Sequence, residues 1–132
     1  NATFEHIDDI EKASMDINRV TCKGGVVRIS VHLYPSLSGG HQLEWAFPEE
    51  SPSKFVPPWD HLRDNLFPSH VFLNKLREKD YLACFSKYFT ILNISSRYEG
   101  KKILSSSIKN ELSDWTTEEL LKRSVQLVLR KE

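Results

Sequence analysis

The sequence is poor in several features that would narrow its function. It has only two cysteines, Cys22 and Cys84, whose separation fits neither a metal site nor a disulfide framework. We therefore expect both to be small buried residues in a reducing compartment. Neither sign of charge is in surplus, since 18 basic residues face 18 acidic ones. The composition thus gives no sign of binding to nucleic acid or to an anionic membrane.

Long hydrophobic runs are also absent. No stretch approaches the roughly 20 apolar residues that span a bilayer, and the acidic N-terminus lacks the apolar core of a signal peptide. We therefore expect a cytoplasmic chain with no membrane and no nucleic acid among its partners. The length of 132 residues and the apolar content of 39% predict a single domain, residues 1–132, with a core of its own.

The segment 8–33 has the clearest pattern, which is helix, glycine turn and strand. Asp8 or Asp9 can cap the helix, and Asp8 with Glu11 is a possible capping box. Apolar residues then recur at near-helical spacing, namely Ile10, Ala13, Ile17 and Val20. Gly24-Gly25 supplies the stop. The β-branched run 26–31 predicts a strand, and its nearly continuous apolar character is typical of a strand covered on both faces.

The segment 34–74 changes in character. It contains all six prolines, and it predicts an irregular insertion with one short helix near Trp59–Asp64, packed over a cleft. Aromatic residues this dense are not expected to remain in water. We therefore predict burial of the following side chains: Trp45, Phe47, Phe55, Trp59, Phe67 and Phe72.

The remainder alternates helices and strands. The patterns predict a helix over 78–89, a strand over 90–98, a helix within 101–112, a short helix over 116–121 and a strand over 124–130. Thr116 and Glu119 form a second capping box. We expect the last two strands to be an antiparallel pair, because a helical excursion joins them.

Two motifs then point to a family. The motif Phe4-Glu5-His6-Ile7-x-Asp9, followed by a helix and Arg19-Val20-x-x-x-Gly24-Gly25, resembles the second half of class I S-adenosylmethionine-dependent methyltransferases. In that family the first motif lies against the cofactor. The glycine turn leads into the fifth strand of a seven-stranded sheet, which the fourth and seventh strands flank. The segments 32–41, 59–62 and 117–131 are similar to a bacterial branch of methyltransferase type 11.

The resemblance implies an α/β fold that is the C-terminal portion of a Rossmann-like sheet. One central strand, 26–31, and an antiparallel terminal pair would be flanked by helices. The glycine-rich loop and the acidic residue that bind the cofactor are found nowhere in the 132 residues. The resemblance thus implies a fragment of an enzyme that methylates a small-molecule or sugar-like acceptor. We expect the fragment to be inactive and to bind no S-adenosylmethionine alone.

Two further expectations follow. A non-catalytic interaction domain that retains half of the methyltransferase fold is the alternative function. Strand 26–31 would be left with an unpaired edge, and such an edge favours pairing with an identical copy. We therefore predict a homodimer formed through this strand.

The resemblance assigns Asn1, Ala2, Glu5 and His6 to the cofactor side of the site. The other interpretation is that Glu5 and His6 only fix the turn through hydrogen bonds to the backbone. Which of the two holds stays open at the level of sequence.

Two histidines are candidates for catalysis. His32 ends the fifth strand, and open α/β sheets bind ligands at that edge. His41 follows the glycine turn 38–40 near the same edge, and it can act as a base on an acceptor hydroxyl. The alternatives are a satisfied core histidine and a loop tip, respectively. We interpret His61 and His70 as structural and predict no metal site, because their spacing matches none.

Overall fold

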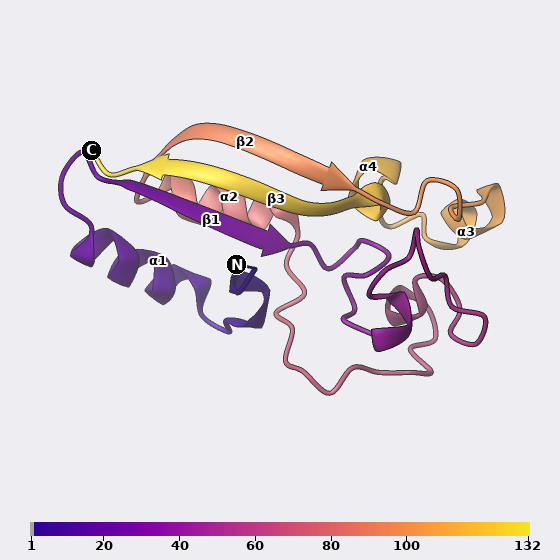
Figure 1. Ribbon diagram of the computed structural model, residues 1–132. Helices are drawn as coiled ribbons and strands as arrows, with labels where there is room; N and C mark the ends of the chain where they lie inside the picture. Colours follow the sequence, from indigo (N-terminus) through magenta and orange to yellow (C-terminus); the bar gives the residue numbers. More distant parts are fainter. Residues whose placement is uncertain (1) are drawn as a thin grey trace.

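The computed structural model describes residues 2–132, and Asn1 lies outside the described residues. The helices and strands are, in chain order, α1 (Ile10–Val20), β1 (Val26–His32), α2 (Glu78–Ser86), β2 (Thr90–Tyr98), α3 (Ser106–Glu111), α4 (Thr117–Leu121) and β3 (Lys122–Arg130). Short 3-10 turns cover Phe4–His6, Leu43–Trp45 and Asp60–Leu62. The chain is a small α/β domain with an antiparallel sheet (Figure 1).

The three strands are ordered β1-β3-β2, and β3 is antiparallel to both neighbours. Val125 of β3 lies opposite Val31 on one side and opposite Ser96 on the other. The predicted antiparallel pairing of the last two strands is confirmed. Within residues 2–132 β1 is an edge strand with the last strand beside it, as expected for a strand that is left with an unpaired edge, and the last strand lies between the other two. On its other side β1 makes one parallel bridge, between Ser30 and Ala2.

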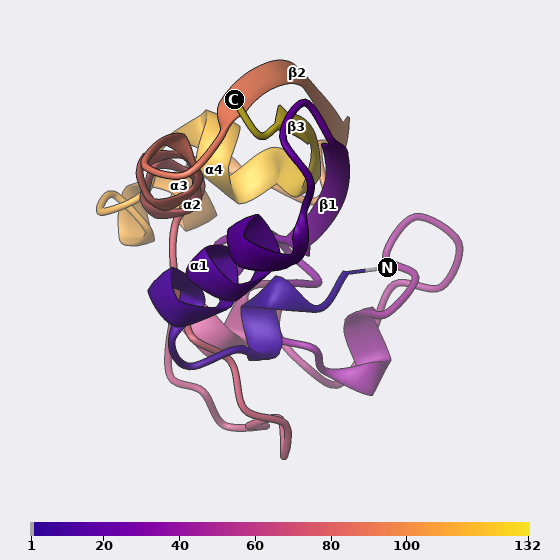
Figure 2. The same ribbon diagram turned by 90° about the vertical axis from the view of Figure 1, so that its left-hand side faces the viewer.

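Both long helices cover the same face of the sheet. Side chains of α1 and α2 pack on one core cluster with the inward residues of the strands, and Figure 2 shows the two helices on one side. Burial along β1 therefore alternates: Ile29 and Val31 are buried, whereas Arg28 is exposed. The prediction of a strand covered on both faces is wrong, because Arg28 and Ser30 present polar groups to the open face.

The ends of the helices follow local chemistry. Asp9 caps α1, and its side chain accepts a hydrogen bond of 2.9 Å from the Lys12 amide. The possible capping box of Asp8 and Glu11 does not form, because the Glu11 carboxylate accepts from Lys87 and Tyr88 instead. Gly24 adopts the positive φ expected after the helix, at 76°. The second capping box, between Thr116 and Glu119, is confirmed with bonds of 2.9 and 3.1 Å.

The irregular segment between β1 and α2 packs on a second, smaller core. Its buried members are Leu37, Trp45, Val56, Trp59, Leu112 and Leu120. Burial is confirmed for both tryptophans, and Trp59 is completely buried. The prediction is wrong for four phenylalanines, Phe47, Phe55, Phe67 and Phe72, which are 43–87% exposed. The two indoles are the aromatic members of this core, whereas Phe67 and Phe72 line surface hollows.

The cysteines differ from one another. Cys84 is buried, as predicted, whereas Cys22 is exposed beside the glycine turn that ends α1, which corrects the prediction. Within residues 2–132, none of the helices is long and apolar enough to cross a membrane.

Candidate functional site

Four of the residues predicted for the site meet at the carboxyl end of β1. We call Glu5, His6, His32 and His41 the histidine–glutamate cluster. Glu5 Oε1 lies 3.8 Å from His6 Nε2 and 4.0 Å from His41 Nε2. The His41 ring centroid is 4.8 Å from that of His6 and 4.7 Å from that of His32. The chain thus brings the two groups of candidates, predicted separately, into one site.

The N-terminal turn is held in place by one asparagine. The Asn74 side-chain amide donates to the carbonyls of Phe4 and Ile7 at 2.8 and 2.9 Å, and its backbone N–H donates to the Glu5 carbonyl. Phe4 is buried edge-on against Phe85 of α2, with ring centroids 5.1 Å apart. These contacts turn the Glu5 carboxylate inward, where it is 3% exposed.

The remaining cofactor-side candidates lie around this turn. Asn1 lies outside the described residues, and Ala2 is exposed and pairs with Ser30. Glu5 Oε2 accepts from the His32 backbone N–H at 3.4 Å, and His6 Nδ1 lies 2.9 Å from the Phe72 carbonyl. Glu5 and His6 thus make the backbone bonds of the structural interpretation, while their other polar atoms face the cluster.

A buried network fixes the tautomer of His32. The Ser38 hydroxyl donates to Glu99 Oε1 at 2.5 Å, and Arg123 pairs with Glu99 Oε2 at 2.7 Å. The Ser38 oxygen must therefore accept from His32 Nε2–H, at 2.8 Å. A neutral imidazole carries one proton, so Nδ1 of His32 keeps a free lone pair. Sequence reasoning missed Ser38 and Glu99; their only signal is that each precedes a glycine.

Both candidate bases are neutral at pH 7. Burial lowers the pKa of His32 to about 3, with a further contribution from His41 and Arg123. Burial also lowers the pKa of His41, and His6 and Arg123 add to the effect. A neutral imidazole can accept a proton or bind a metal ion, whereas an imidazolium cannot.

Two buried polar atoms of the cluster lack a hydrogen-bond partner within residues 2–132. They are Glu5 Oε1 and His41 Nε2. Buried polar atoms are nearly always paired, so an unpaired one needs an explanation. His41 also has φ of 55°, a left-handed conformation that costs energy for a non-glycine residue and is often found at functional sites.

A groove opens beside the cluster. His41 lines it together with Gln42, Leu43, Phe67 and Val71. Its walls are largely apolar, and Leu43 is 89% exposed. His41 is therefore the residue that connects the buried cluster to a surface on which a small molecule can lie.

His61 occupies a structural position, as the sequence analysis expects. Its Nε2–H donates to the Tyr34 carbonyl at 2.8 Å. Burial lowers its pKa to about 4. The Gly40 backbone packs on the ring so closely that a Cβ at Gly40 would lie 2.5 Å from His61 Cγ. This packing fixes the base of the loop that carries His41.

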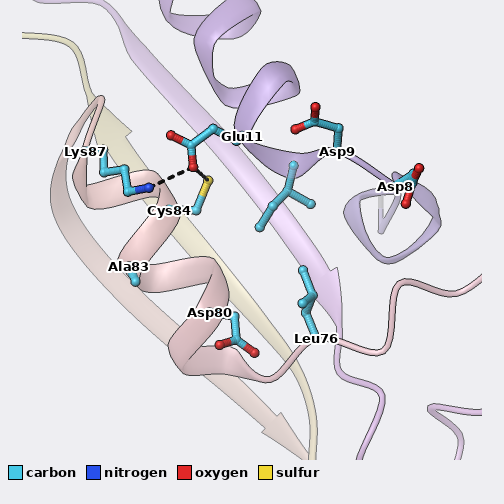
Figure 3. A pocket seen from close by; sticks show the side chains of 9 residues that line it. Asp8, Asp9, Glu11, Leu76, Asp80, Ala83, Cys84 and Lys87 are labelled. Atoms are coloured by element: carbon cyan, nitrogen blue, oxygen red, sulfur yellow. Dashed lines mark hydrogen bonds and ion pairs between the residues drawn. The ribbon is translucent and has the colours of Figure 1, made fainter.

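Figure 3 shows a second hollow, between α1 and α2, with an acidic rim formed by Asp8, Asp9, Glu11 and Asp80. The Glu11 carboxylate in it is satisfied by Lys87 at 2.8 Å and by Tyr88. None of the predicted site residues that the structure describes, all from residue 2 onward, lines this hollow. We therefore place the candidate site at the end of β1.

The donor set of the cluster is suited to a metal ion, although the sequence analysis predicted none. One ligand atom each from Glu5, His32 and His41 lies within 4.8 Å of the others. His32 and His41 are nine positions apart and Glu5 is 27 positions before His32, which matches no common metal-binding spacing. In comparisons with known proteins, no family model matches this chain, and no curated protein matches it significantly.

Proposed function

We propose that this chain supplies the acceptor side of an S-adenosylmethionine-dependent methyltransferase, as the C-terminal portion of a Rossmann-like class I domain. The observation that carries the proposal is the gathering of Glu5, His6, His32 and His41 at the carboxyl end of β1, beside a groove. Ligands of open α/β sheets bind at this edge. The acceptor in this proposal is a small molecule with a hydroxyl group.

The neighbours of β1 support the proposal. In the family that the sequence resembles, the fourth and seventh strands flank the fifth. Here β1 pairs with the last strand, β3, on one side. On the other side Ala2 makes a parallel bridge to Ser30, directly before the Phe4–His6 turn. This arrangement is the one that a fifth strand would have.

His41 is the base in the proposed reaction. Its neutral ring lines the groove, while Nε2 is buried beside Glu5 and has no hydrogen-bond partner among residues 2–132. Methyl transfer to a hydroxyl requires removal of the hydroxyl proton, which a positioned imidazole accelerates by about 10²–10⁴-fold. Glu5, 4.0 Å away, stabilises the imidazolium that results. Methyl transfer also depends on positioning, which the apolar walls of the groove supply.

The described residues do not by themselves fit the cofactor, which would supply the methyl group. Its ribose needs an exposed carboxylate, yet Glu5 is buried and directed at histidines. We therefore assign the cofactor site to segments outside this chain. Calorimetric titration of the chain with S-adenosylmethionine should show no binding in the micromolar range, about −8 kcal/mol.

The proposal is tested with the complete product of the gene that encodes this chain. We expect it to transfer a labelled methyl group from S-adenosylmethionine to members of a panel of sugar-like and other small hydroxyl compounds. The 132-residue chain is the matched control and should be inactive. Micromolar cofactor binding by the chain alone, or no methyl transfer by the complete product, contradicts the proposal.

A binding module without catalysis is the second candidate. The observation that favours it is the apolar surface of the irregular segment, where Leu43 and Phe55 are 89% and 87% exposed. Such surfaces mark interaction sites. The coding sequence upstream of Asn1 separates the two functions, because only the enzyme requires a glycine-rich loop and a ribose-binding acid there.

A further inference from the structure

We propose that Glu5, His32 and His41 bind one divalent transition-metal ion, of the class of Zn²⁺ or Co²⁺. Their ligand atoms lie within 4.8 Å of one another, on three separate segments of the chain. The inference does not depend on the proposed methyl transfer, because it concerns the residues of this chain and an ion alone.

The first argument is that acceptor atoms of the site face one another with no hydrogen-bond donor from the described part of the chain between them. His6 Nδ1 bonds to the Phe72 carbonyl oxygen, which only accepts, so Nδ1 carries a proton. Glu5 Oε1 and His41 Nε2 are buried without a hydrogen-bond partner among residues 2–132. The Nδ1 atom of His32 has a free lone pair, because the proton of this neutral ring is on Nε2, which donates to Ser38. A cation between Glu5, His32 and His41 satisfies the unpartnered atoms of these three residues.

The second argument is the distance between Glu5 and His41. Their unpartnered atoms are 4.0 Å apart, which is too long for a hydrogen bond. Two ligands at about 2.0–2.2 Å from one tetrahedral ion are separated by roughly 3.4 Å. A side-chain movement of about half an ångström brings the pair to this separation.

The third argument is the set of groups behind the ligands. Histidines that bind metals almost always donate their other ring N–H to a carboxylate, a carbonyl or a water molecule. His32 does so through the Ser38 hydroxyl, which donates in turn to Glu99, and Arg123 donates to the other oxygen of Glu99. This relay is buried, and it fixes the orientation that Nδ1 needs.

The ligand types select the ion. Two imidazoles and one carboxylate suit zinc, cobalt, nickel and iron, whereas magnesium and calcium prefer oxygen ligands throughout. Three protein ligands leave a fourth position open, as in catalytic zinc sites. His6, beside the same carboxylate oxygen, is available for that position, and His41 places the ion next to the groove.

The experiment uses the chain itself, stripped with a chelator and dialysed. Titration with Co²⁺, followed by visible absorption, and with Zn²⁺, followed by calorimetry, should give one site with a dissociation constant in the micromolar range or tighter. Glu5→Gln and His41→Ala should each weaken binding at least tenfold. His70→Ala is the matched control, because His70 is exposed and lies outside the converging ligands; it should bind as the wild type does.

Ser38→Ala keeps every ligand and removes the hydroxyl that accepts from His32 and donates to Glu99. We expect it to bind the ion about 10–100-fold more weakly, and circular dichroism of each variant verifies that it is folded. No binding by the folded wild-type chain overturns the proposal. Equal binding by the wild type, Glu5→Gln and His41→Ala also overturns it, because the ion would then occupy another site.

Discussion

Glu5 and His41 face each other across 4.0 Å, and neither Glu5 Oε1 nor His41 Nε2 has a hydrogen-bond partner among residues 2–132. One comes from a turn clamped by Asn74, and the other from a left-handed position after a glycine turn. Two independent segments therefore hold a buried acceptor and an imidazole in an arrangement that contributes little to stability. Such an arrangement is typical of a site kept for binding or chemistry.

The second core predicts a large effect of one tryptophan. Trp59 is completely buried against Leu37, Trp45 and Leu120. We expect Trp59→Ala to lower the free energy of unfolding by about 3–5 kcal/mol, through lost burial and the cavity that remains. Phe55→Ala is the control, since this ring is 87% exposed and should change stability by less than about 0.5 kcal/mol. Urea denaturation measures both, and equal effects would contradict the assignment of the core.

His61 predicts how stability depends on pH. Burial lowers its pKa to about 4 in the folded chain, whereas the unfolded chain has the ordinary value near 6.5. The unfolded state therefore binds the proton first. The burial of neutral His61 therefore costs no stability above pH 6.5. As the pH falls from 6.5 towards 4, the free energy of unfolding decreases by up to about 3 kcal/mol.

His61→Gln cannot titrate, so its stability should fall less steeply than that of the wild type between pH 6.5 and 4.5. His70→Gln removes an exposed histidine and is the control, with the slope of the wild type. Urea denaturation at several pH values gives the slopes. The same slope for His61→Gln and the wild type would show that His61 is not the group responsible.

The free edge of β1 predicts self-association. Within residues 2–132 this edge makes the Ala2–Ser30 bridge and the bond from the His32 N–H to Glu5, and Val26 is 56% exposed on it. We expect the isolated chain to form a dimer at high micromolar concentration through this strand. Val26→Lys should shift it to monomer. Val20→Lys, the same change at a 70% exposed position on α1, should not.

Light scattering coupled to gel filtration measures the mass of each variant. A monomeric wild type, with the amides of β1 exchanging freely, would refute the prediction. In a longer protein that contains the neighbouring strand we expect no such dimer, because the edge would be paired.

The sequence predicted features that are set locally, and it failed where distant segments decide. The capping box of Thr116 and Glu119 and the glycine stop at Gly24 depend on adjacent residues, and both are present. The position of β1 depends on the insertion of β3, which no local pattern reveals. Composition likewise could not separate the buried Trp59 from the exposed Phe55.

The same distinction between local features and contacts of distant segments holds for the site. His32 and His41 were expected at one edge of the sheet because topology places strand ends there, and Glu5 and His6 because of the resemblance. Their mutual contact was not predicted, since it depends on the fold of the irregular segment. Ser38 and Glu99 form the most buried polar pair at the site, yet 61 positions separate them in sequence. A hydrogen bond between residues so far apart in the sequence cannot be predicted from the spacing of residue types.

The effect of His41 on turnover tests the account most directly. In the complete gene product we expect His41→Ala to lower kcat by about 10²–10⁴-fold, with an unchanged melting temperature, because the ring is a loop residue that faces the groove. Added imidazole should restore part of the rate of this variant. Unchanged turnover in His41→Ala would contradict the account, and so would a loss of activity that only follows a loss of stability.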